Sequence, residues 1–140
     1  MDFVESQEMK IKLNEEDRAQ LSSSERISQA LKNREALAFD IFESGDLIGF
    51  AMVRPFARDG FFIWNFAIDD KWQGKGYGRK ALLNLISLLR EEYHAVQFTI
   101  TYSFGNSRAK HLYEKVGFQE TNTVNENGIH EVNMRLEFET

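Results

Sequence analysis

The stretch that decides the fold is residues 61–79, which read FFIWNFAIDDKWQGKGYGR. A mainly apolar run predicts a strand, an acidic pair follows, and three glycines within five residues lead directly into a long helical pattern. Such a turn predicts an anion site, because the first N–H groups of the helix lack intrahelical partners and the helix dipole adds about half a positive charge there. The glycines let a phosphate group approach the backbone without interference from a Cβ atom.

Two common phosphate-binding fingerprints do not fit this turn. The dinucleotide pattern G-x-G-x-x-G fails because Arg79 stands where the third glycine is needed. The nucleotide-triphosphate loop G-x-x-x-x-G-K-[ST] also fails, because no Gly-Lys pair occurs at that spacing. The pattern present is Q-x-x-G-x-G, from Gln73 to Gly78.

Composition narrows the classes of protein. At 140 residues, 42% of them hydrophobic, the chain is predicted to form one globular domain over residues 1–140. No apolar run reaches the length of a membrane span, the N-terminus lacks a signal-peptide core, and there is no cysteine, so a cytoplasmic protein without membrane association is expected. The net charge of −5 argues against nucleic-acid binding, and three histidines without ligand spacing argue against a metal site.

Hydrophobic periodicity predicts an α+β fold, bordering on α/β, with about six to seven strands and about four helices. Besides residues 61–68, strands are predicted at Met9–Leu13, Leu37–Glu43, Leu47–Arg54, Ala95–Ile100, Phe118–Val124 and Ile129–Phe138. Helices are predicted after the caps Asn14 and Ser22–Ser24, after the glycine turn, and between Asn106 and Gly117. The strand–helix–strand order makes residues 95–100 parallel to residues 61–68, and hairpins make the rest of the sheet mostly antiparallel.

A second motif lies downstream of the glycine turn. Asn106 is followed seven residues later by Tyr113, within the pattern A-x-x-L-Y-E-K-x-G-F. The two motifs, in this order and at this separation, resemble those of the GCN5-related N-acetyltransferase (GNAT) superfamily, in particular its bacterial spermidine/spermine-type members. The resemblance implies a GNAT-like fold in which the two parallel strands splay apart around acyl-CoA. It also implies acetyl-CoA as co-substrate.

The resemblance assigns roles to individual residues. Backbone groups of the strand would contact the acetyl carbonyl and pantetheine arm at Phe66, Ala67 and Ile68. The pyrophosphate would lie against the loop formed by Gln73, Gly74, Lys75, Gly76, Tyr77, Gly78 and Arg79. Asn106 would hydrogen-bond the pantetheine or its strand, and Tyr113 would be the general acid near the thioester sulfur.

Each role has a purely structural alternative. Phe66 and Ile68 suit a core, Asn106 suits a helix cap, and Tyr113 lies on the apolar face of its helix, where aromatic residues usually pack. The general base is in doubt, because Trp64 and Asn65 stand where related enzymes often have a carboxylate. Water relayed through backbone carbonyls is the default expectation.

The function that follows from the resemblance is N-acetyl transfer to a primary amine of a small molecule, with polyamines favoured, by direct attack in a ternary complex. Two alternatives stay open: a protein or peptide N-acetyltransferase acting on an N-terminus or a lysine, and a non-catalytic acyl-CoA sensor. A nucleotide-binding domain is disfavoured by the two failed fingerprints. The resemblance also suggests a homodimer, for which the C-terminal hairpin could supply a surface.

Overall fold

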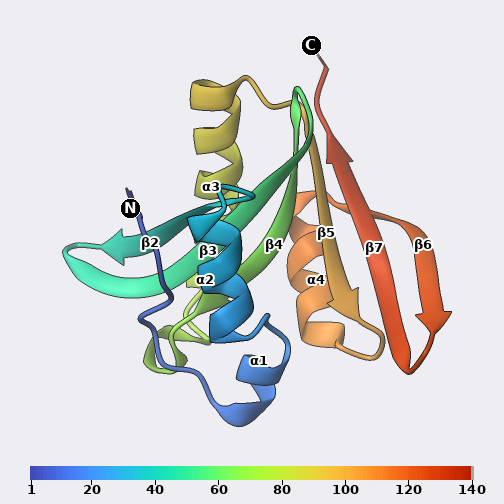
Figure 1. The fold of residues 1–140 in the computed structure, drawn as a ribbon, viewed down its shortest axis with the longest axis horizontal. Coiled ribbons are helices and arrows are strands. Elements are labelled where there is room, and N and C mark those ends of the chain that lie inside the picture. Colours follow the sequence, from blue (N-terminus) through green and yellow to red (C-terminus); the bar gives the residue numbers. More distant parts are fainter. Residues whose placement is uncertain (140) are drawn as a thin grey trace.

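Seven strands form one mixed sheet in the computed structural model, which describes residues 1–139 (Figure 1). In sheet order the strands are β1 (Asp2–Glu5), β2 (Leu37–Glu43), β3 (Asp46–Ala57), β4 (Gly60–Ile68), β5 (Gln97–Ser103), β7 (Ile129–Glu137) and β6 (Gln119–Glu126). Every neighbouring pair is antiparallel except β4 and β5, which are parallel. The predicted α+β fold and its parallel pair are therefore confirmed.

Helices cover both faces of the sheet. In Figure 1, α1 (Glu15–Ala19) and α2 (Ser24–Lys32) lie in front of it, whereas α3 (Tyr77–Tyr93) and α4 (Ser107–Val116) lie behind it. The first two helices begin where predicted: Asn14 Oδ1 accepts the Asp17 N–H at 2.8 Å, and Ser23 Oγ accepts the Arg26 N–H at 3.1 Å. Within residues 1–139 no helix is long and apolar enough to cross a membrane.

Two apolar clusters, one on each face, fix the helices to the sheet. Behind the sheet, α3 buries one stripe against the central strands through Ala81, Leu82, Leu85, Ile86 and Leu89. In front, α2 buries Ile27, Ala30 and Leu31 against Phe50 and Met52 of β3. The front face of β5, β7 and β6 carries no helix (Figure 1), and β6 is exposed along most of its length.

The strand predicted at Met9–Leu13 is wrong. The first strand is β1, and the predicted segment is irregular, with its backbone tied at Lys12 to the loop that follows β4. Met9, Ile11 and Leu13 nevertheless pack together on the front cluster. The alternating pattern therefore came from an extended chain lying over the core, without the ladder hydrogen bonds of a sheet.

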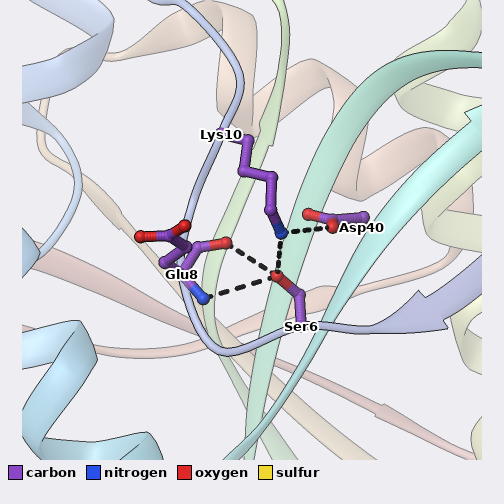
Figure 2. Close-up of polar contacts among 4 residues, drawn as sticks. All are labelled: Ser6, Glu8, Lys10 and Asp40. Atoms are coloured by element: carbon purple, nitrogen blue, oxygen red, sulfur yellow. Dashed lines mark hydrogen bonds and ion pairs between the residues drawn. The ribbon is translucent and has the colours of Figure 1, made fainter.

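A buried carboxylate holds this N-terminal segment in place (Figure 2). Asp40, on β2, is 6% exposed, and the Lys10 ammonium donates to its Oδ2 at 2.8 Å and to Ser6 Oγ at 2.9 Å. The Ser6 hydroxyl in turn donates to the Glu8 carbonyl at 2.7 Å. Lys10 thus supplies the charge that compensates a carboxylate on the covered face of the sheet.

Removing that charge is expected to destabilise the protein. Lys10→Met leaves Asp40 buried without its cation, and Asp40 Oδ1 already has no partner among the described residues. Because the lysine side chain is 46% exposed, the expected loss in the free energy of unfolding is about 1–3 kcal/mol. Urea denaturation measures it, with Lys12→Met as the matched control, since that side chain is exposed on the same segment. Equal stability of the two variants would contradict the assignment.

Candidate active site

The two parallel strands pair over only part of their length. Residues 60–63 of β4 pair with residues 97–100 of β5, although the strands continue to Ile68 and Ser103. Beyond the paired part the strands diverge (Figure 1). The facing edges of residues 64–68 and 101–103 therefore have no strand partner across the gap. The carbonyls of Ile68 and Ser103 accept from Gln73 Nε2 and the Asn106 N–H, and the other backbone polar groups along these edges can bind water or a ligand.

A bulge in β4 coincides with the point of divergence. Val53 of β3 is opposite Ile63, and the next residue back, Met52, is opposite Asn65, so Trp64 is an extra residue in the ladder. Bulges bend a strand and change which face its side chains occupy. The bulge at Trp64 thus accompanies the separation of β4 from β5.

A cleft of about 940 Å³ occupies this divergence. It is bounded by β4, the loop before α3, the end of β5, α4, and the α1–α2 segment. The predicted site residues that line it are Phe66, Ala67, Ile68, Gln73, Gly74, Gly76, Gly78, Arg79, Asn106 and Tyr113. Two predicted residues, Lys75 and Tyr77, do not line the cleft. Both lie against Trp72: the Lys75 ammonium is 5.4 Å from a ring centroid of the indole, and the centroid of the Tyr77 ring is 5.6 Å from one.

The glycine loop has the geometry of an anion site. Gly74 and Gly76 adopt φ of +76° and +84°, in the left-handed region, and a Cβ atom added at either would meet no atom within 4 Å. Gly76 is the N-cap of α3 and provides no side-chain oxygen, so no side-chain cap occupies the first-turn N–H groups. The open space, the uncapped N–H groups and the helix dipole together fit a diphosphate.

Gln73 connects the elements around the loop. Its Nε2 donates to the Ile68 carbonyl at 2.8 Å and to Asp17 Oδ2 at 3.0 Å, and its Oε1 accepts from Arg108 Nη2 at 2.8 Å. One amide therefore links the end of β4 to α1 and α4. The side chain fixes the loop, and its polar atoms are already engaged.

Asn106 is a helix cap that also lines the cleft. Its Oδ1 accepts the Ala109 N–H at 3.2 Å and thereby starts α4. Within residues 1–139 its Nδ2 has no hydrogen-bond partner, and the residue is half-buried at the cleft wall. The cap and a contact with a ligand are compatible, because they use different atoms of the amide.

Tyr113 is held by aromatic packing. Its ring lies 6.4 Å from that of Tyr102 and 6.2 Å from that of Phe118, and its hydroxyl has no hydrogen-bond partner in the described chain. Burial disfavours the phenolate and raises the pKa of Tyr113 to about 12. The Tyr102 hydroxyl, by contrast, donates to Glu120 Oε1 at 2.7 Å. Tyr113 therefore presents a protonated, unengaged hydroxyl at the cleft wall.

The two residues at the expected base position are both engaged elsewhere. Asn65 is 2% exposed, and its Oδ1 accepts the Ser22 N–H at 2.9 Å, which ties the α1–α2 segment to β4. The guanidinium groups of Arg26 and Arg54 contact the Trp64 ring, with their central carbons 4.7 and 4.9 Å from its centroid. Neither side chain can take a proton, as the sequence indicated.

Charged residues of both signs line the cleft. The basic liners all come from the two helices behind the sheet: Arg79, Arg108, His111 and Lys115. The acidic liners come from α1 and β7: Asp17 and Glu131. Sequence reasoning missed both carboxylates and the end of β5, residues 101–103, because nothing local in the sequence places β7 or α1 at the cleft.

Comparison with known proteins agrees with this geometry. The sequence model of the Acetyltransferase (GNAT) family matches residues 4–118. A spermine/spermidine N(1)-acetyltransferase of Bacillus subtilis is 35% identical over 96 residues, which are 63% of this chain and 62% of that protein. A ribosomal-protein alanine N-acetyltransferase of Haemophilus influenzae is 34% identical over 93 residues, 64% of this chain and 62% of that protein. The chain thus spans about three fifths of the length of these curated relatives.

A solved structure shares the fold over nearly the whole chain. A GNAT family acetyltransferase from Elizabethkingia anophelis, solved with acetyl-CoA bound, superposes with a TM-score of 0.73 at 20% identity, covering 98% of this chain and 97% of that one. The family model spans most of the sequence, and this structure shares the fold. The chain belongs to the GNAT acetyltransferase family.

Proposed function

We propose that this protein is an acetyl-CoA-dependent N-acetyltransferase that acts on a primary amine of a small molecule, with polyamines as the favoured class. The observation that carries the proposal is the open, uncapped glycine loop at the mouth of a cleft between two diverging strands. Family membership and the similarity to a spermine/spermidine acetyltransferase support it. The homodimer stays a prediction. Two aromatic residues of the C-terminal hairpin segment face the core and do not supply a dimer surface: Phe118 is 2% exposed, and the Phe138 ring packs on Phe98.

The residues divide the work by their positions. Acetyl-CoA would supply the acetyl group as a thioester. The amine nitrogen of the acceptor forms the C–N bond, the C–S bond breaks so that CoA leaves as its thiolate, and the amine gives up one proton. N–H groups of the loop around Gly74 and Gly76 bind the diphosphate, and the basic residues of α3 and α4 add positive charge. Tyr113 offers its hydroxyl proton to the departing sulfur. Neither Trp64 nor Asn65 can accept the proton of the amine, and we assign that proton to water.

A protein or peptide acceptor is the second candidate. It is favoured by the relative from Haemophilus influenzae, whose identity to this chain matches that of the polyamine enzyme. The uncovered front face of β5, β7 and β6 is the surface against which a peptide could extend. This candidate and the polyamine candidate predict different acceptors in one assay.

Thiol release from acetyl-CoA, followed with a chromogenic disulfide reagent, tests the proposal. The panel holds spermidine, spermine, diamines, aminoglycosides, single amino acids and short peptides. Because the chain has no cysteine, the protein adds no background thiol. Saturable release with polyamines supports the favoured class, and release only with peptides supports the second candidate. Binding of acetyl-CoA without release from any acceptor would instead identify a sensor.

The pH dependence of the reaction is expected to follow the pKa of the acceptor amine, because Tyr113 keeps its proton. An alkylamine with a pKa of about 10.4 must lose its proton before attack, so kcat/KM for the acceptor is expected to rise about tenfold per pH unit from about pH 7 to about pH 9. Burial raises the pKa of Tyr113 to about 12, so the donor keeps its proton throughout this range. Steady-state rates across pH measure both effects. A decline near pH 10 that disappears in Tyr113→Phe would contradict the raised pKa.

A further inference from the structure

The cleft contains one acidic residue whose carboxylate has no partner among the described residues. Of the two acidic liners, Asp17 accepts hydrogen bonds from Gln73 Nε2 and from Asn14 Nδ2. Glu131 is half-buried at the start of β7, and its side chain makes no hydrogen bond or ion pair with any described residue. A half-buried carboxylate that lines a cleft and lacks a partner is suited to a cationic ligand.

Strand register places Glu131 on the face opposite Tyr113. Glu131 is directly across from Ser103, so the two side chains share one face of the sheet. The neighbouring Tyr102 belongs to the cluster behind the sheet and contacts Tyr113 there. Because side chains alternate along β5, Ser103 and Glu131 point to the front face, where the α1–α2 segment lies. The cleft opens to both faces, with Tyr113 at one wall and Glu131 at the other.

We propose that Glu131 binds a second, non-reacting ammonium group of the acceptor, and that it thereby makes the enzyme select diamines and polyamines over monoamines. This inference rests on the proposed acetyl transfer. The reacting nitrogen must be neutral to attack, and a carboxylate beside it would stabilise its charged form and raise its pKa. Glu131 therefore acts on the nitrogen that keeps its charge. Its location away from Tyr113 agrees with this, because the proton donor marks the reacting end.

The geometry also limits where that second nitrogen can lie. On the phosphate side, the basic liners from α3 and α4 repel an ammonium group. Arg26 and Arg54 add positive charge beside Trp64 of β4, which packs on the front cluster. Glu131 lies on β7, across from Ser103 at the free end of β5. Among the described lining residues, Glu131 is the acidic side chain without a hydrogen-bond partner, so it is free to pair with a cation that enters the front of the cleft.

The test compares two acceptors in two variants. Linear diamines and monoamines of equal carbon number are assayed with wild type, Glu131→Gln and Glu126→Gln; the last removes the same charge at the exposed end of β6, outside the cleft. In Glu131→Gln the kcat/KM ratio of diamine to monoamine is expected to fall about 10- to 100-fold, mainly through KM for the diamine. KM for acetyl-CoA and the monoamine rate are expected to stay unchanged, as is every parameter of Glu126→Gln.

Glu131→Asp keeps the negative charge and shows whether the effect of Glu131→Gln comes from lost binding of the diamine or from damage to the fold. It is expected to recover part of the diamine preference, whereas a purely structural role would show equal losses with both amines. An unchanged diamine preference in Glu131→Gln overturns the inference.

Failure of the proposed activity would be recognised separately, by absence of thiol release with every acceptor in wild type. Calorimetric titration of spermidine into the CoA-loaded protein then decides the role of Glu131. Weaker binding by Glu131→Gln supports it, and equal or absent binding overturns it.

Discussion

Replacing Gly76 by glutamate is expected to abolish acetyl-CoA binding while the fold survives. The new carboxylate would occupy the open space at the N-terminus of α3 and repel the diphosphate that the loop is proposed to bind. We expect affinity to fall at least about 100-fold, which corresponds to about 3 kcal/mol. The cost to the fold is small by comparison, about 1–2 kcal/mol for a side chain at φ of +84° with no clash. Isothermal titration with acetyl-CoA measures the loss.

Gly45→Glu is the matched control for this experiment. Gly45 lies in the turn between β2 and β3, has φ of +83°, and also has no atom within 4 Å of an added Cβ. The substitution therefore brings the same charge and the same backbone strain outside the cleft. Full acetyl-CoA affinity in Gly76→Glu, or equal losses in both variants, would show that the loop does not bind the diphosphate.

Replacing Tyr113 by phenylalanine is expected to lower kcat about 10- to 100-fold and to leave acetyl-CoA affinity unchanged. The effect is bounded, because a phenol with a pKa of about 12 is a weak donor to a thiolate whose conjugate acid has a pKa of about 8.5. Complete proton transfer between them would be uphill by about 5 kcal/mol. The hydroxyl therefore helps as a hydrogen bond or in a concerted step. Single-turnover kinetics with pre-bound acetyl-CoA measure it.

Tyr93→Phe removes a hydroxyl of the same kind elsewhere. Tyr93 is 36% exposed at the end of α3, does not line the cleft, and contacts Phe61 through its ring. Its turnover should equal that of wild type. If Tyr113→Phe matches it, Tyr113 is only a packing residue.

Most helices and strands were predicted correctly because the residues that start and end them lie within a few positions of each other in the sequence. The caps at Asn14 and Asn106 and the left-handed glycine at Gly117 each act within one turn of a helix, so short sequence windows contain them. The strand Met9–Leu13 failed because alternation reports burial of every second side chain, which an unpaired extended chain on a core also produces. Pairing depends on distant partners that the window does not contain.

The candidate site was predicted in part for the same reason. The glycine loop and Tyr113 belong to contiguous motifs, and the structure brings them to one cleft. The strand expected at Ala95–Ile100 runs instead from Gln97 to Ser103, because Ala95 lies in the turn that closes α3 after Tyr93, with its N–H bonded to the Leu89 carbonyl. That shift adds the cleft-lining residues 101–103. Glu131 enters only through the register of β7 against β5, which a single sequence does not specify.

Because β4 and β5 share only a short ladder, the melting temperature of the protein is expected to report whether a ligand occupies the cleft between them. Four residues of each strand join the β1–β4 half of the sheet to the β5–β6–β7 half, and the remaining edges face the cleft. A molecule that hydrogen-bonds to both free edges would complete the sheet, so the folded protein would gain stability by mass action, about 2.7 kcal/mol at a ligand concentration 100 times Kd. Melting curves recorded against a library of acyl thioesters and amines would then rank ligands even where no product forms.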